Sequence, residues 1–181
     1  MMQTDELPPV RVPRSAKRLV AVAPDRVRRF RKHLVKAMRE ARELRQIAPV
    51  RAPVLSGVAA RVAGIACGLC QGWCCRHGGD DAYLDGDTMA RVRAAMPERD
   101  ARAVARLYVE RVPEAVFEES CIFHGVEGCT LDRSMRADIC NSYFCGGLAT
   151  YLKAAGAAGP VVVIAGEGDD ARLASVLVPP G

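Results

Sequence analysis

The spacing of eight cysteines constrains this chain more than any other feature. Two dense groups, separated by 45 residues, contain all of them: Cys67, Cys70, Cys74 and Cys75, then Cys121, Cys129, Cys140 and Cys145. A Cys-x2-Cys step places two sulfurs on one side of a tight turn, where they can share one ion. Thiolates are soft ligands that suit zinc or iron–sulfur centres. We therefore expect these cysteines to bind Zn2+ or an iron–sulfur cluster, in one centre, two centres or a bridged cluster.

The expected compartment supports this interpretation. No early stretch has the apolar run and cleavage site of a signal peptide, and the sequence contains no apolar run of 18 residues. We expect a cytoplasmic protein without a membrane span. In a reducing compartment, clustered thiols are more often metal ligands or redox groups than disulfides. Metal binding is therefore favoured over a disulfide framework and over buried, inert thiols.

The ligand set stays open in two respects. Cys74 and Cys75 are adjacent, so we expect their side chains to diverge and to be awkward ligands of one tetrahedral ion. His77 and His124 each lie within three residues of a cysteine, and an imidazole can replace a thiolate at zinc. For both histidines the alternative is a solvated loop residue.

Charged residues near the cysteines have simpler explanations. Four aspartates follow the first group closely, and their spacing lacks the glycine and glutamate of an EF-hand, so a solvated acidic loop is favoured over a cation site. Two arginines near the second group could offset thiolate charge or hold a carboxylate, and we favour a structural role. These residues are Asp80, Asp81, Asp85 and Asp87, and Arg133 and Arg136.

The runs CGLCQGWCCRHGG and CIFHGVEGCTLDRSMRADICNSYFC resemble the YkgJ-type cysteine-cluster family of zinc- or iron-chelating domains. The resemblance covers roughly residues 64–148, about half of the chain. One departure is that three residues, not two, separate Cys70 from Cys74. The matching positions are Cys67, Cys70, Cys74, Cys75, Cys121, Gly128, Cys129, Arg136, Cys140 and Cys145.

The resemblance implies a metal-binding module, and the broader group includes a much longer flagellin lysine methylase with an iron–sulfur centre. A metal-dependent enzyme, for redox chemistry or protein lysine methylation, is therefore one alternative function. The run Gly166–Ala171 superficially matches a nucleotide-binding fingerprint. Only ten residues follow it, which is too few for the helix and strand that such a site requires. Common hydrolase, P-loop and zinc-protease motifs are absent, so the sequence favours a binding protein over an enzyme.

The remaining patterns predict an α+β fold, a small helix-dominated domain with irregular cysteine-rich loops and a C-terminal β-hairpin. Apolar periodicity predicts a helix from Asp25, as its cap, to about Ile47. Residues 1–24 are expected to be loosely ordered, the state of 56–66 is open, and 120–147 is expected to be irregular. Further helices are expected from a cap at Asp87 or Thr88 to Met96, from Pro97 to Arg111, and over 148–155, and hairpin strands over 161–165 and 173–178.

Charge divides the chain. Residues 1–55 contain 14 basic and 5 acidic side chains, although the whole chain carries only +5. We expect three parts: a basic arm with an amphipathic helix (1–55), a cysteine-cluster domain (56–156) and a β-prone segment (157–181). The basic helix face contains Arg28, Arg29, Lys32, Lys36, Arg39 and Arg42. It supports a second alternative, an adaptor that binds an acidic partner or a nucleic-acid backbone.

Overall fold

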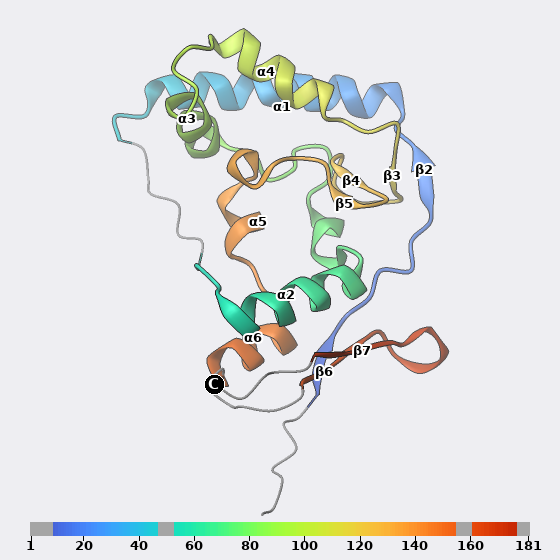
Figure 1. Cartoon of the computed structure of the whole chain (residues 1–181). Coiled ribbons are helices and arrows are strands. Elements are labelled where there is room, and N and C mark those ends of the chain that lie inside the picture. The colour runs from blue at the N-terminus through green and yellow to red at the C-terminus, as the bar shows by residue number, and fades with distance from the viewer. Residues whose placement is uncertain (1–8, 47–52, 155–160, 177–181) are drawn as a thin grey trace, which may run out of the picture. The chain divides into compact units, whose positions relative to one another are not determined.

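The computed structural model describes residues 9–46, 53–154 and 161–176, in which runs of helices are separated by runs of short strands (Figure 1). Segments distant in sequence form two compact units. Unit 1 comprises Met1–Ala16, Val54–Trp73 and Phe144–Gly181; unit 2 comprises Lys17–Pro53 and Cys74–Tyr143. Helices dominate and the sheets are small, so the predicted α+β class is confirmed.

Unit 1 is built on a three-stranded sheet in the order β1-β6-β7. β1 (Val10–Val12) pairs in parallel with β6 (Val161–Ala165), and β6 pairs antiparallel with β7 (Arg172–Val176). β6 is a run of four β-branched residues followed by Ala165, and every second residue of the strand is buried. The predicted C-terminal hairpin is therefore confirmed, with a short turn, η3 (Gly168–Asp170), in its loop. Residues 177 and 178 of the predicted second strand lie outside the described residues.

Two helices complete unit 1. α2 (Gly57–Cys70) packs on β6, and α6 (Gly146–Ala154) packs on β1. Gly147 is needed at the α6 contact because a Cβ there would overlap the backbone carbonyl oxygen of Arg11. The resulting core is almost entirely aliphatic and contains Val10, Val12, Val62, Ala66, Leu148, Val163 and Ala165.

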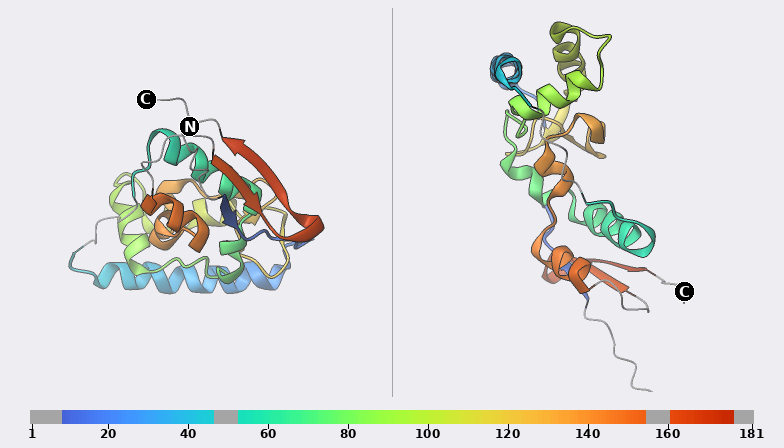
Figure 2. Two further views of the ribbon diagram at one scale, coloured as in Figure 1. Left: turned by 90° about the horizontal axis from the view of Figure 1, so that it is seen from below. Right: turned by 90° about the vertical axis from the view of Figure 1, so that its left-hand side faces the viewer.

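Unit 2 is organised around α1 (Pro24–Glu43), which packs against α3 (Gly86–Ala94) and α4 (Ala101–Glu110) (Figures 1 and 2). The apolar side of α1 is buried, with Phe30 meeting Phe123 edge to face at 5.1 Å. The same core includes Leu34, Met38, Met89, Val104, Tyr108 and Ile122.

Short elements form the rest of unit 2. β2 (Leu19–Ala21) pairs antiparallel with β3 (Ala115–Phe117), and β4 (His124–Gly125) pairs with β5 (Gly128–Cys129). η1 (Trp73–His77) crosses from unit 1 into unit 2, and η2 (Arg133–Met135) and α5 (Asp138–Ser142) follow β5. The predicted irregular segment 120–147 thus contains elements of only two to five residues before α6 begins.

The structure corrects three local predictions. Residues 1–24 are not uniformly loose, because β1 and β2 find partners more than 90 positions away. Ala23, not Asp25, is the N-cap residue of α1, and Asp25 instead pairs with Arg29 one turn later. α3 is capped by Asp85, whose carboxylate accepts a hydrogen bond from the Thr88 backbone at 2.8 Å.

The predicted boundaries at 55/56 and 156/157 do not coincide with the two units. α1 shares its core with α3 and α4, so the basic helix is an integral part of unit 2. β1 belongs to the sheet that contains β6 and β7. The predicted helix ends at Ile47 and at 155 lie outside the described residues. No helix in the described ranges is long and apolar enough to cross a membrane.

Candidate metal centre

Cys74 and Cys75 reach unit 2 through a tight reversal of the chain. α2 ends at Cys70 and is followed by Gln71 and Gly72, whose φ angles of 50° and 69° lie in the left-handed region. This pair of residues stops the helix and turns the chain into η1, which contains both cysteines. The local sequence therefore separates Cys70 on a helix from Cys74 on a 3-10 turn.

Cys121 lies directly against that turn. Its backbone N–H donates to the Cys75 carbonyl at 2.9 Å, and the Gly78 N–H donates to the same oxygen at 3.0 Å. A Cβ at Gly78 would lie 2.8 Å from Cys121 Cβ and 3.2 Å from its Sγ. Only glycine leaves room for Cys121 at this position.

The other two cysteines come from later segments of unit 2. Cys129 ends β5, opposite His124 in the ladder, and Cys140 lies in α5. Arg136 lies between them in sequence and donates from its guanidinium to the carbonyls of Leu131, at 2.8 Å, and Cys129, at 3.4 Å. Unit 2 therefore contains five cysteines, which we name the sulfur group: Cys74, Cys75, Cys121, Cys129 and Cys140.

Cys74 and Cys75 affect each other's ionisation, although the prediction that they are awkward ligands of one ion stays a prediction. A hydrogen bond from Cys75 lowers the pKa of Cys74 to about 6. The same bond, together with burial and nearby thiolate charge, raises the pKa of Cys75 far above its usual range. In a 3-10 turn, successive side chains point about 120° apart rather than to opposite sides, so two adjacent sulfurs can meet.

Burial and mutual repulsion govern two further thiols. Burial, reinforced by the charges of Cys129 and Cys140, raises the pKa of Cys121 to about 12. Burial also raises the pKa of Cys140 to about 11, with Cys129 and Cys74 adding to the effect. Arg26 and Arg136 act in the opposite direction, on Cys121 and Cys140 respectively. The five thiols thus share one electrostatic environment in which a cation would be favourable.

The donor set fits a thiophilic metal in its chemistry. Five sulfurs come from four separate stretches of backbone, and two arginines already offset part of their charge. As the side chains are placed in the described residues, no three His, Cys, Asp or Glu groups are close enough to hold one ion. Coordination would require the sulfurs to approach one another further.

The remaining three cysteines belong to unit 1. Cys67 and Cys70 lie one turn apart on α2, with Cys67 exposed and Cys70 buried in the aliphatic core. Cys145 immediately precedes α6 and is half-buried against the same core. Each predicted group of four is therefore divided between the units, because the chain crosses between Trp73 and Cys74 and again between Tyr143 and Phe144.

The two candidate histidines have different surroundings. His124 is buried, is hydrogen-bonded through Nδ1 to Ser120 Oγ at 2.7 Å, and packs against the Phe117 ring with the ring centroids 4.6 Å apart and the planes tilted by 40°. His77 is exposed, and its Nε2 accepts a hydrogen bond from Arg76 at 2.8 Å. His77 also lines a pocket on unit 2.

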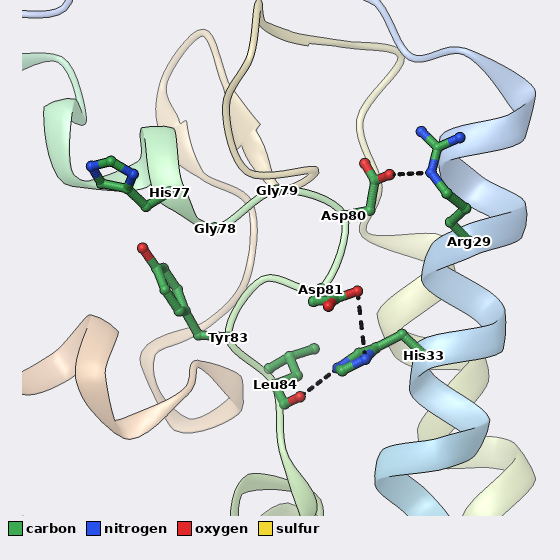
Figure 3. A pocket seen from close by; sticks show the side chains of 9 residues that line it. All are labelled: Arg29, His33, His77, Gly78, Gly79, Asp80, Asp81, Tyr83 and Leu84. Carbon is green, nitrogen blue, oxygen red and sulfur yellow. Dashed lines mark hydrogen bonds and ion pairs between the residues drawn. The ribbon is translucent and has the colours of Figure 1, made fainter.

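That pocket, of about 520 Å3, is shown in Figure 3. It adjoins the sulfur group, because its lining residue Gly78 lies against Cys121. Tyr83 connects the two, since it lines the pocket while burial and four cysteines raise the pKa of its hydroxyl. Its hydroxyl points toward His77 (Figure 3). Ala82 and Tyr83 both have positive φ, at 52° and 56°, a strained backbone that is frequent at functional sites.

Three aspartates of the predicted acidic loop have protein partners. Asp80 accepts hydrogen bonds from Arg26 at 2.5 Å and Arg29 at 2.6 Å, and Asp85 caps α3. Asp81 lies 3.5 Å from His33 Nδ1, while the Nε2 of that ring donates to the Leu84 carbonyl. These contacts fasten the loop to α1 and α3.

Sequence reasoning gave no site role to Gly78, Tyr83 or Arg26. The close approach at Gly78, the position of Tyr83 between thiols and pocket, and the bond from Arg26 to the Ser120 carbonyl at 2.7 Å all depend on tertiary contacts. The Gly78-Gly79 pair was the one available signal, because paired glycines mark a turn.

Comparison with known proteins adds no relative: no family model, curated protein or solved structure matches this chain. The resemblance to the cysteine-cluster family therefore stays a prediction.

Proposed function

We propose that this protein binds a thiophilic metal through the sulfur group, either as Zn2+ or as an iron–sulfur cluster. The observation that supports the proposal most is the gathering of five thiols from four backbone segments into one shared electrostatic environment. Such thiols repel one another when ionised, and a bound cation would lower their pKa values and release their protons. A thiolate-ligated ion would also tie together segments that have little regular structure.

Cys67, Cys70 and Cys145 of unit 1 are the remaining proposed ligands. They would serve a second site or would join the sulfur group in one centre. Which of these holds is a question of stoichiometry, since one zinc takes four ligands while two sites or a cluster take more metal.

Anaerobic purification followed by elemental analysis tests the proposal. We expect at least one equivalent of zinc or iron per chain. Absorption near roughly 400 nm together with acid-labile sulfide would identify an iron–sulfur cluster, since filled-shell zinc gives no such colour. A folded protein that contains neither metal would contradict the proposal.

A metal-dependent enzyme, for redox chemistry or lysine methylation, is a second candidate, and the pocket beside the sulfur group favours it. Tyr83, His77 and Asp81 would meet a molecule bound there. An enzyme of this kind needs a metal position that an outside molecule can reach, whereas structural sites are closed. If the metal is iron, titrating the protein with azide tests this, because an accessible iron should change its absorption and a closed site should not.

The adaptor alternative depends on a different surface, the exposed face of α1. It is independent of the metal proposal, since the cations of that face lie on the side of the helix away from the core.

A further inference from the structure

The cations of α1 fall into two classes. Arg26 and Arg29 donate to Asp80, Arg29 also pairs with Asp25, and Lys36 lies 3.7 Å from Glu40. Five others are exposed and form no ion pair with any acid in the described ranges. We name them the basic stripe: Arg28, Arg31, Lys32, Arg39 and Arg42.

Helix geometry aligns the basic stripe on one side. Each residue advances about 100° around the axis, so these five positions fall within an arc of about 100°. At 1.5 Å per residue, the distance from Arg28 to Arg42 is about 21 Å along the axis. The opposite arc contains Phe30, Leu34 and Ala41 and is buried. Burial of the apolar side of α1 in the core thus leaves the basic stripe on the solvent-exposed side of the helix.

The arrangement opposes helix stability. Arg28 and Lys32 are four residues apart, and Arg28–Arg31 and Arg39–Arg42 are three apart, spacings at which like charges destabilise a helix by a few tenths of a kcal/mol. A surface face chosen for stability would alternate signs, as Lys36 and Glu40 do. The nearest acid on this side is Glu43, four residues after Arg39, and it forms no ion pair with the stripe in the described residues. The uncompensated positive charge therefore suits an external polyanion.

We propose that the basic stripe binds the phosphate backbone of a nucleic-acid duplex. A length of about 21 Å corresponds to about six base-pair steps of 3.4 Å, so each cation can meet a phosphate. Four of the five are arginines, whose planar guanidinium pairs with phosphate through two hydrogen bonds. The contact is with backbone, because the stripe has no aromatic side chain on which unpaired bases could stack.

Other polyanions fit less well. A helix that lies in a membrane surface inserts its apolar face, and the apolar face of α1 is already buried in unit 2. A protein interface has an apolar centre surrounded by polar residues. The only large apolar side chain within the stripe is Val35, which is 60% exposed.

The test uses the full-length protein as purified and labelled 20-base-pair DNA and RNA duplexes, with affinity measured between about 50 and 200 mM salt. Five phosphate contacts predict that log K falls with log salt at a slope of about −4.5, which is roughly a 500-fold loss over this range. The duplex that binds more tightly, DNA or RNA, identifies which nucleic acid the basic stripe prefers.

Two double variants of equal charge test whether the duplex binds at the basic stripe. Arg28→Gln/Lys32→Gln should reduce the slope by about 2. Arg102→Gln/Arg106→Gln removes two exposed arginines one turn apart on α4 and should leave the slope unchanged. An equal reduction of the slope in both double variants would overturn the proposal. The absence of duplex binding at 50 mM salt would also overturn it. Binding to phosphatidylserine vesicles or polyglutamate as tight as to duplex would also overturn it. Metal content, measured in each sample, reports on the sulfur group separately.

Discussion

Cys70 and Cys121 are equally buried, each 8% exposed, but they lie in different surroundings. Cys70 ends a regular 14-residue helix and packs among aliphatic residues of unit 1. Cys121 lies in a loop of unit 2, where burial, with a smaller contribution from neighbouring thiols, raises its pKa. Equal burial therefore conceals two different settings, which differ in the neighbours of the thiol and in the regularity of the backbone.

The two units also differ in what can hold them together. Unit 1 has a hydrogen-bonded sheet covered by two helices, so we expect it to keep its fold without metal. In unit 2, residues 120–143 contain no element longer than five residues within the described chain. We expect this segment to depend on the sulfur group, in the way that loop-rich sites gain folding free energy from metal binding.

The largest expected effect comes from a matched pair of cysteine substitutions. Cys121→Ser should abolish metal binding by the sulfur group and remove a stabilisation of about 10 kcal/mol, the order found for structural zinc. Cys70→Ser places a hydroxyl in an aliphatic core and should cost about 1–3 kcal/mol, confined to unit 1. Metal analysis with hydrogen exchange measures both. Loss of all bound metal in Cys70→Ser as well would show that Cys70 and Cys121 serve one centre, and would contradict the contrast between them.

The next effect concerns unit 1 alone. Gly147→Ala should destabilise unit 1 by about 3 kcal/mol or more, because the new Cβ would overlap the Arg11 carbonyl oxygen and backbone would have to move. Gly146→Ala is the control, since nothing lies within 4 Å of its Cβ position. Hydrogen exchange should show faster opening of β1 and β6 in Gly147→Ala, with metal content retained. Loss of metal in this variant would mean that the sulfur group depends on unit 1.

The smallest effect tests how unit 2 fixes its acidic loop. Burial alone would raise the pKa of Asp80. Hydrogen bonds from Arg26 and Arg29 outweigh this effect and hold the pKa of Asp80 below its usual value. Asp80→Asn should cost about 1–3 kcal/mol at pH 7. Asp81→Asn, at a side chain that is 65% exposed and only 3.5 Å from His33, should cost at most about 0.5 kcal/mol.

The pH dependence of that difference has a definite sign. A carboxyl whose pKa is lowered on folding stabilises the protein above its unfolded pKa of about 3.9, and the contribution is lost as the pH falls through the folded value. The stability gap between wild type and Asp80→Asn should therefore be constant above about pH 5 and shrink below about pH 4. Denaturant titrations at several pH values measure it, and a gap that persists in acid would argue for a packing role.

Local patterns predicted much of the fold. Apolar residues at helical spacing located α1, and β-prone runs around a glycine-rich turn located β6 and β7. Local patterns did not predict strands whose pairing partner is distant in the sequence. β1 and β2 are three residues long and carry no periodic signal, so they exist only because β6 and β3 are present to pair with them.

By itself, the sequence determined the α+β class, the amphipathic side of α1 and the identity of the candidate ligands, because residue type and short-range spacing fix these. Only the tertiary structure determined which cysteines lie near one another. It separated Cys70 from Cys74, brought Cys121 against Cys75, and paired Arg26 and Arg29 with Asp80. Each of these outcomes depends on where the chain crosses between units and on which residues pack after the chain has folded back, and spacing along the sequence does not contain that information.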